Sequence, residues 1–251
     1  MNILVSVKRV PLTGGKITLT EDERAIQTRH LGFTVSPHEE CAAEEAIRLV
    51  EQHGGESVVL TLGPAEAEEQ LRDMMAIGID RGIHLVTDGE EWDPQATAAA
   101  ILAAIGEDGT SYDLLLFGNE SADAGNYQVA IRVAHALGLP CVTGVKAISV
   151  DGNTLRCEQE VPGGRDVYEV PMPAVVTVKE GINLPRYPSV PGRMRAKRKP
   201  LAGAAPAWSE SKLEMRRLLL PEGSSKQAEV LGTGADAAPA VVQILQELGV
   251  M

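Results

Sequence analysis

The chain has 251 residues, a formal net charge of −12 and a pI near 4.9. Hydrophobic residues make up 44% of it and aromatic residues only 3%, so aliphatic side chains can form one sizeable core. This length fits one large domain, or one domain with an arm, and the acidic charge argues against wholesale binding to nucleic acid.

The sequence shows no sign of targeting or membrane insertion. An apolar run at residues 2–8 is too short for a signal peptide and precedes no small-residue cleavage site. No stretch approaches the length of a membrane span. The three cysteines, Cys41, Cys141 and Cys157, lack metal-ligand spacing and are interpreted as small core residues. We therefore expect a cytoplasmic protein with reduced thiols and no membrane insertion.

In chain order, strands alternate with helices as far as residue 140. Ser36, Pro37 and Glu39 carry the signals of a helix start, namely an N-cap, a first-turn proline and a capping box. Such alternation predicts parallel βαβ units, that is, an α/β fold with helices on both faces of the sheet. The predicted strands are 3–7, 57–62, 82–86 and 112–117, and the predicted helices begin at 36, 64, 93 and about 126.

After residue 140 the pattern becomes β-rich. Segments 144–150, 154–160 and 166–170 are separated by hairpin signals, and 174–178 is a further buried strand. Residues 201–251 are rich in Ala, Pro and Ser and end in a predicted helix at 237–248. We expect one domain over 1–200 with a β-hairpin extension, and a C-terminal arm over 201–251 that lacks enough apolar residues for a core of its own.

The loop 118–126 is the best candidate for a nucleotide site. It joins a buried strand to a predicted helix, and free backbone N–H groups at a helix start attract phosphate. Asn126, Tyr127, Gln128 and Val129 would supply these donors, while Asp123 would hold a ribose hydroxyl or cap the turn. Glycine-bearing loops of this kind are also common without any nucleotide. The Gly-x-Gly-x-x-Gly and P-loop motifs are absent, which favours a nucleotide that is held and not cleaved.

The segment 182–199 is strongly basic within an acidic chain. Six of the 23 Lys and Arg residues lie between Arg186 and Lys199, and three prolines predict an extended surface loop in its first half. A basic loop with an apolar tip at Val190 and Met194 indicates a docking surface, although a solvated linker explains the composition equally well.

No group of residues resembles a catalytic or metal site. The five histidines are scattered, and no nucleophile elbow is present. The acidic pairs 39–40 and 44–45 are interpreted as the solvated face of a helix, with favourable charge at its N-terminus.

With these segments in order, residues 1–200 resemble the β subunit of electron transfer flavoprotein. The last two matching blocks are the most specific. The matching blocks are Val7-Lys8-Arg9-Val10-Pro11, 44–49, Gly63-Pro64, 75–81, Asp123 with Gln128-Val129, 173–177, and Asn183-Leu-Pro-Arg-Tyr187 with Met194-Arg-Ala-Lys197.

The resemblance implies a Rossmann-like domain that pairs with an α subunit. The α subunit would carry most of the redox FAD, and this chain would bury a structural AMP. AMP contacts are implied at Ser6, Ser36, Leu62, Gly63, Gly118, Asp123, Gly125, Asn126, Tyr127, Gln128 and Val129. Residues beside the shared FAD would be Pro11, Leu12, Thr13 and His38.

The resemblance also implies the partners. The basic segment would be the loop that docks acyl-CoA or other flavin dehydrogenases, and a quinone oxidoreductase would accept the electrons. Val190 stands where the family presents an apolar anchor. The docking residues would be Arg186, Tyr187, Val190, Pro191, Arg193, Met194, Arg195 and Lys197.

Several positions depart from the family pattern. Leu12 replaces the usual Asp, Ser36 the usual Asn, Gly125 the second acid of the phosphate loop, and Ala130 a glycine. Electron-bifurcating relatives, which hold a second FAD in place of AMP, usually keep both acids, so the change at Gly125 favours AMP. A bifurcating subunit with NADH-dependent activity and a stand-alone nucleotide-binding regulatory protein remain the alternatives to a non-enzymatic electron carrier.

Overall fold

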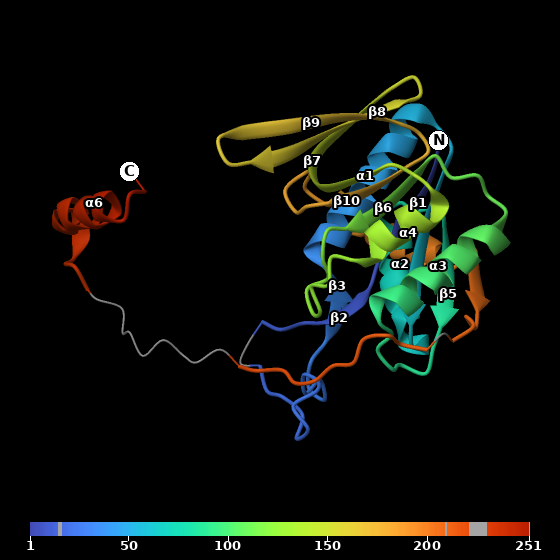
Figure 1. Ribbon diagram of the computed structural model, residues 1–251, viewed down its shortest axis with the longest axis horizontal. Helices are drawn as coiled ribbons and strands as arrows, with labels where there is room; N and C mark the ends of the chain where they lie inside the picture. Colours follow the sequence, from blue (N-terminus) through green and yellow to red (C-terminus); the bar gives the residue numbers. More distant parts are fainter. Residues whose placement is uncertain (15–16, 209, 221–229, 251) are drawn as a thin grey trace.

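The computed structural model describes residues 1–14, 17–208, 210–220 and 230–250, and within these residues a mostly parallel nine-stranded sheet organises the chain (Figure 1). Its strand order is β11-β5-β4-β1-β6-β10-β7-β8-β9. The strands are β1 (Asn2–Ser6), β4 (Glu56–Gly63), β5 (Arg81–Val86), β6 (Leu114–Gly118), β7 (Cys141–Asp151), β8 (Thr154–Val161), β9 (Gly164–Pro171), β10 (Ala174–Val178) and β11 (Leu201–Ala204).

Helices cover both faces of the sheet, as predicted (Figure 1). Successive residues of β1 belong to opposite cores: Ile3 packs with α1 and α2, whereas Leu4 packs with α3 and α4. This alternation is the period-2 pattern of a strand buried on both sides. The helices of the body are α1 (Pro37–His53), η1 (Ala65–Ala67), α2 (Glu68–Ile77), α3 (Pro94–Asp108), α4 (Val129–Leu137) and α5 (Val190–Ala196).

The helix boundaries follow local chemistry. Asp93 caps α3 by accepting the Ala96 N–H at 2.7 Å, and Gly109 ends the helix in the left-handed region. At α1, the Glu39 carboxylate reaches back to the Ser36 N–H, as in a capping box, at 3.3 Å. The Ser36 hydroxyl instead accepts the Ala122 N–H, so it links two segments that are far apart in sequence.

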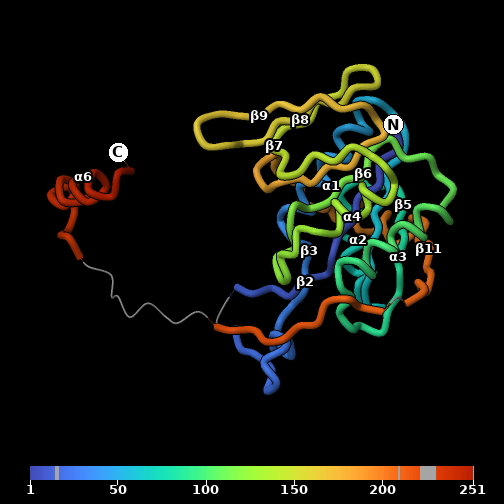
Figure 2. Tube along the Cα trace, viewed as in Figure 1, coloured from blue at the N-terminus to red at the C-terminus, as the bar shows by residue number. Residues whose placement is uncertain are grey.

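Two short strands and an antiparallel extension complete the body. Strand β2 (Arg9–Pro11) pairs with β3 (Phe33–Val35) directly before α1, while β7, β8 and β9 form the predicted antiparallel extension at one end of the sheet (Figure 2).

The C-terminal segment is only partly separate from the body. Strand β11 pairs in parallel with β5, so residues 201–204 belong to the sheet although they follow the boundary predicted at residue 200. The predicted terminal helix is present as α6 (Ala238–Glu247), preceded by η2 (Gly234–Ala237), and none of its residues is buried. Helix α6 lies apart from the sheet in Figure 1.

Candidate functional site: a cavity at the switch point of the sheet

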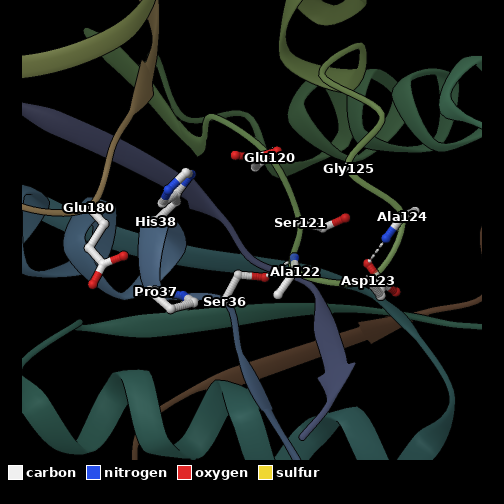
Figure 3. Close-up of a pocket in the computed structure, with 10 residues that line it drawn as sticks. All are labelled: Ser36, Pro37, His38, Glu120, Ser121, Ala122, Asp123, Ala124, Gly125 and Glu180. Carbon is white, nitrogen blue, oxygen red and sulfur yellow. Dashed lines mark hydrogen bonds between the residues drawn. The ribbon is translucent and has the colours of Figure 1, made fainter. Parts of the chain in front are cut away.

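A cavity of about 360 Å³ opens near the carboxyl ends of β6 and β10. The chain proceeds from β1 to β4 and β5 on one side of β1 and then returns to β6 on the other side, so the strand order reverses between β1 and β6. Open parallel sheets bind ligands at such a switch point. One wall is the start of α1 and the other is the loop after β6 (Figure 3). The lining residues are Ser36, Pro37, His38, Ser121, Ala122, Ala124, Gly125, Glu120, Asp123 and Glu180.

A buried carboxylate holds the base of this site together. Glu39 accepts the Lys8 N–H at 3.0 Å and the Ser36 N–H at 3.3 Å, which ties the end of β1 to the start of α1. Burial raises the pKa of Glu39 to about 8, because these two donors offset only part of the desolvation of its charge.

An ion pair between Lys8 and Asp123 attaches the loop after β6 to the end of β1. Lys8 Nζ lies 2.7 Å from Asp123 and 2.5 Å from Glu91. Burial favours neutral Lys8, but the two carboxylates outweigh it and raise its pKa. Burial likewise opposes the charge on Asp123, but Lys8 holds its pKa below the usual value. Asp123 also accepts the Ala124 N–H at 2.6 Å, so it caps the turn as predicted in one of the two roles considered.

The cavity offers acceptors on its walls. Glu120, Asp123 and Glu180 line it, and the Nδ1 atom of His38 is buried without a partner among the described residues. Carboxylates and an orphaned imidazole nitrogen suit sugar hydroxyls and a base, whereas the carboxylates repel a phosphate. An anionic group would have to lie toward the start of α4 instead.

Helix α4 begins at Val129, three residues later than predicted. Gly125 and Tyr127 both have left-handed backbone conformations, with φ of 55° and 56°, so residues 125–128 form an irregular turn before the helix. The N-terminal donors of α4 accordingly start at Val129, and Asn126 and Tyr127 are loop residues.

The structure brings together only part of the predicted nucleotide site. Ser36, Asp123 and Gly125 line the cavity, as does His38, which was predicted to lie beside FAD. Ser6, Gly63 and Gly118 are the last residues of β1, β4 and β6, so they share the correct sheet edge, with Leu62 beside Gly63. The predicted residues outside the lining are Ser6, Leu62, Gly63, Gly118, Asn126, Tyr127, Gln128 and Val129.

Gly118 is required for packing against α1. A Cβ atom at this position would lie 2.6 Å from Glu39 Cγ and 3.3 Å from His38 Cβ. The absence of a side chain at Gly118 therefore allows β6 and α1 to approach closely.

The residues expected beside FAD come from two neighbouring elements. Pro11 ends β2, and the Leu12 N–H donates to the Gly32 carbonyl at 2.9 Å. Leu12 and Thr13 are exposed, whereas His38 is half-buried at the cavity. Strand β3, which pairs with β2, leads directly into Ser36, so β2 and the start of α1 belong to one hairpin-and-helix unit.

The basic segment is a fixed structure and not a free loop. Residues 183–189 are irregular, as predicted, but α5 begins at Val190, where Ser189 caps it by accepting the Gly192 N–H at 3.1 Å. We call residues 183–199 the docking segment. Its exposed side chains include Tyr187, Val190 and Met194, which are 95%, 74% and 65% exposed.

A buried ion pair attaches the docking segment to α1. Arg186 donates from Nε and from its backbone N–H to Glu44, at 2.9 and 3.1 Å, and it also contacts Glu51. Glu44 is 2% exposed and Glu45 is buried, so the prediction of a solvated acidic face is wrong for both residues, and also for Glu39. Burial alone would raise the pKa of Glu44, but the bonds from Arg186 and Arg48 lower it. Arg186 is thus a structural clamp.

The other basic side chains of the docking segment divide into two groups. Arg193 pairs with Asp73 at 2.7 Å, and Lys199 Nζ donates to the Met75, Gly78 and Ile79 carbonyls at the end of α2. Arg195 and Lys197 are exposed. Of the four basic residues predicted to dock a partner, Arg186 and Arg193 are held in ion pairs, and Arg195 and Lys197 have no ion pair among the described residues.

The roles of three residues at the cavity were not predicted from the sequence. Lys8 lies in the strand-end turn Ser6-Val7-Lys8, which the sequence marks as a possible ligand position, but its ion pair with Asp123 was not predicted. Glu180 follows β10 and likewise lies at a strand end. Glu39 was identified only as the acid of a capping box, because an acid in a first helical turn is ordinarily solvated.

Within the described ranges, no group of three or more His, Cys, Asp or Glu side chains could hold a metal ion. No helix among the described residues is long and apolar enough to span a membrane. Cys41 and Cys157 are buried as predicted, Cys141 is partly buried, and all three are free thiols.

The strand order and the helices on both faces of the sheet define an α/β protein with a Rossmann-like fold and a polar cavity at its switch point. Comparison with known proteins identifies its family. Residues 25–207 match the electron transfer flavoprotein domain. The chain belongs to the electron transfer flavoprotein family, among the β subunits.

Three relatives, each named electron transfer flavoprotein subunit beta, illustrate the similarity. The Bacillus subtilis protein is 37% identical over 80% of this chain and 77% of its own length. The protein of Syntrophomonas wolfei is 39% identical over 88% of this chain and 86% of its own. The protein of Bradyrhizobium diazoefficiens is 33% identical and is matched over the full length of both chains.

Proposed function

We propose that this chain pairs with an electron transfer flavoprotein α subunit and holds AMP in the cavity at the switch point. The pair accepts electrons from acyl-CoA or other flavin dehydrogenases and passes them to a quinone oxidoreductase. The observation that carries the proposal is the cavity itself: a family member has a ligand-sized space between the start of α1 and the loop after β6. Its volume lies at the lower end of the range of about 300–1,000 Å³ for small-molecule sites.

The residues present fit a mononucleotide. The free Nδ1 of His38 and the carboxylate of Glu180 suit hydroxyl and base donors, and the donors at the start of α4 suit the phosphate. Asp123 is already paired with Lys8. Loss of the Asp123 side chain would therefore remove the ion pair that holds the loop after β6 as well as an acceptor for the ligand. AMP supplies no redox chemistry, and its role here is to fill and order the site.

The FAD of the α subunit would lie against β2 and the start of α1. Residues 11–13 and His38 would exclude water from one side of the flavin, while the flavin itself supplies the electron chemistry. The chain contributes no catalytic residue in this proposal. The exposed apolar residues of α6 and of residues 213–220 would pack on the α subunit.

Counting nucleotides tests the proposal. The chain is co-expressed with an α subunit, purified, denatured, and analysed for released nucleotides. One FAD and one AMP per heterodimer are expected. Two FAD and no AMP would establish the bifurcating alternative, and an unpaired chain with no flavin would support the stand-alone regulatory protein.

Docking is tested at the exposed apolar residue of α5. An apolar side chain buried on docking contributes about 1.5–3 kcal/mol, so Val190→Asp should slow electron transfer from a dehydrogenase strongly and Val190→Ala only in part. Charge reversal at Arg195 should slow association at low salt and have little effect at high salt. Unchanged rates for Val190→Asp would contradict the docking role.

A further inference from the structure

A second cavity lies beneath the docking segment, and nothing above gives it a function. It has a volume of about 360 Å³ and lies between residues 184–188, the start of α1 and one face of α2. Met74 and Ile77 give it an apolar floor, while Gln70, Glu40 and Asp73 bring polar groups to it. We call this cavity the docking groove.

Two acceptors in the docking groove have no partner within the described part of the chain. Gln70 is 2% exposed and its Oε1 atom receives no hydrogen bond. The Glu40 carboxylate, which is partly buried, makes no ion pair or hydrogen bond with any described residue. Buried polar groups of this kind ordinarily have donors, so each is a place where a ligand can supply one.

The two arginines that line the docking groove are already paired with carboxylates. Arg186 is held by Glu44 and Glu51, and Arg193 by Asp73. Glu40 therefore keeps an uncompensated charge. Burial, and repulsion from Asp73 and Glu180, raise its pKa above the usual value, so a cation placed here would relieve both costs.

The rim of the docking groove is apolar, exposed and fixed. Leu184 and Tyr187 are 85% and 95% exposed. The backbone between them cannot withdraw these side chains easily, because Asn183 donates to Glu45 and to the Cys41 carbonyl and Arg186 is clamped by Glu44. Rigid exposed aromatic residues are typical of binding hot spots.

We propose that the docking groove receives one basic side chain, an arginine or a lysine, from an exposed loop of the electron-donating partner. The aliphatic stem would lie on Met74 and Ile77, and the charged head would reach Glu40 and the Gln70 amide, beneath the Tyr187 ring. An arginine fits best, because its fork can donate to a carboxylate and an amide oxygen together. The partner's identity rests on the proposed function, whereas the chemistry of the docking groove does not.

A small-molecule titration tests the chemistry without any dehydrogenase. The protein is purified with its α subunit, or alone if no α subunit co-purifies, with methyl-labelled Met and Ile. It is titrated with Nα-acetyl-arginine methylamide and with the neutral citrulline analogue. The Met74 and Ile77 methyl signals should shift and saturate with the arginine compound, and about five-fold more weakly with the citrulline compound, the ratio expected for one charge pair.

Variants locate the interaction. Glu40→Gln and Gln70→Leu should each weaken arginine binding, whereas Glu69→Gln, which removes an exposed charge one residue from Gln70, should leave it unchanged. Equal binding of the two compounds, equal effects of Glu40→Gln and Glu69→Gln, or no shift in the wild type would overturn the proposal.

Kinetics with a flavin dehydrogenase test the partner. Glu40→Gln should raise the KM for the heterodimer about five-fold with kcat and flavin content unchanged, and Glu69→Gln should not. An unchanged KM despite arginine binding overturns the docking role. Self-association that Glu40→Gln abolishes would instead assign the docking groove to a second copy. If no dehydrogenase reduces the wild type, the proposed function fails, and the titration still decides whether the docking groove binds a cation.

Discussion

The cavity and the docking segment both rest on a buried glutamate of α1, and the two glutamates behave in opposite ways. Glu39, beneath the cavity, accepts only backbone N–H groups, and burial raises its pKa to about 8. Glu44, beneath the docking segment, meets a guanidinium, which lowers its pKa. Both are acids of α1 with little exposed surface, but arginine side chains bond to Glu44 and only backbone N–H groups bond to Glu39. A buried acid that pairs with a cation stays ionised and holds two segments together, whereas a buried acid without a cation takes up a proton more readily.

The largest effect should follow removal of the clamp. Glu44→Ala leaves Arg186 and Arg48 without their buried acceptor, and we expect it to lower the free energy of unfolding by about 2–3 kcal/mol. This is less than a fully buried pair loses, because the Arg186 side chain is 38% exposed. Urea denaturation measures the change. The control is Glu51→Ala, which removes the exposed partner of the same arginine and should cost at most about 0.5 kcal/mol. Equal losses would refute the clamp.

A side chain inserted between β6 and α1, beside Glu39, should have the next largest effect on stability. Gly118→Ala places a Cβ atom 2.6 Å from Glu39 Cγ, so β6 and α1 must separate, at a cost of about 1–3 kcal/mol. Gly106→Ala is the matched control, since nothing lies within 4 Å of a Cβ atom there and alanine favours the helix. Thermal unfolding should show opposite shifts for the two variants.

The pH dependence separates the two glutamates. The pKa of Glu39 is near 8 in the folded state and about 4.5 when unfolded, so the folded protein binds the extra proton and loses stability as pH rises through this window. Between pH 6 and 7 the free energy of unfolding should fall by up to about 1.4 kcal/mol because of Glu39. Glu39→Gln should remove this loss of stability with rising pH. Glu44→Gln should not remove it, because the pKa of Glu44 is lowered in the folded protein, so Glu44 stabilises the fold only at pH values above its unfolded pKa. A wild type and a Glu39→Gln variant with parallel stability profiles would disprove a protonated Glu39.

The smallest effect concerns the end of the docking segment. Lys199→Met removes three charge-assisted bonds to carbonyls at the end of α2 and should cost about 1 kcal/mol. Lys197→Met, at an exposed position two residues away, should be neutral. Hydrogen exchange of the α2 amides near residue 77 should increase in the first variant and remain at the wild-type level in the second.

Much of the fold could be predicted because its signals are local. Short apolar runs identified the buried strands, and capping residues such as Ser36 and Asp93 identified the helix starts. Glycine-containing turn signals identified both hairpin turns. Strand β11 could not be predicted, since Leu-Ala-Gly-Ala lacks the β-branched residues that mark a strand. The start of α4 was placed too early because the sequence does not reveal that Tyr127 adopts a left-handed backbone.

The site was predicted less completely, because its chemistry depends on distant contacts. The strand ends and the loop after β6 were found from the order of elements alone. Asp123 was identified, but its partner Lys8 lies on another strand end. The burial of Glu44 depends on Arg186, which is 142 residues away, so no helical pattern could reveal it.

Strand β11 has a mechanical consequence for recognition. The chain leaves the middle of the sheet at β10, crosses over α1 and α2, and re-enters the sheet at its far edge as β11. The docking segment is therefore held by a strand of the sheet at each end and by the Arg186–Glu44 ion pair between them, so it cannot move far from the body. As the docking surface proposed above, it would lose little conformational entropy on contact with a partner, so more of the contact energy would remain as affinity.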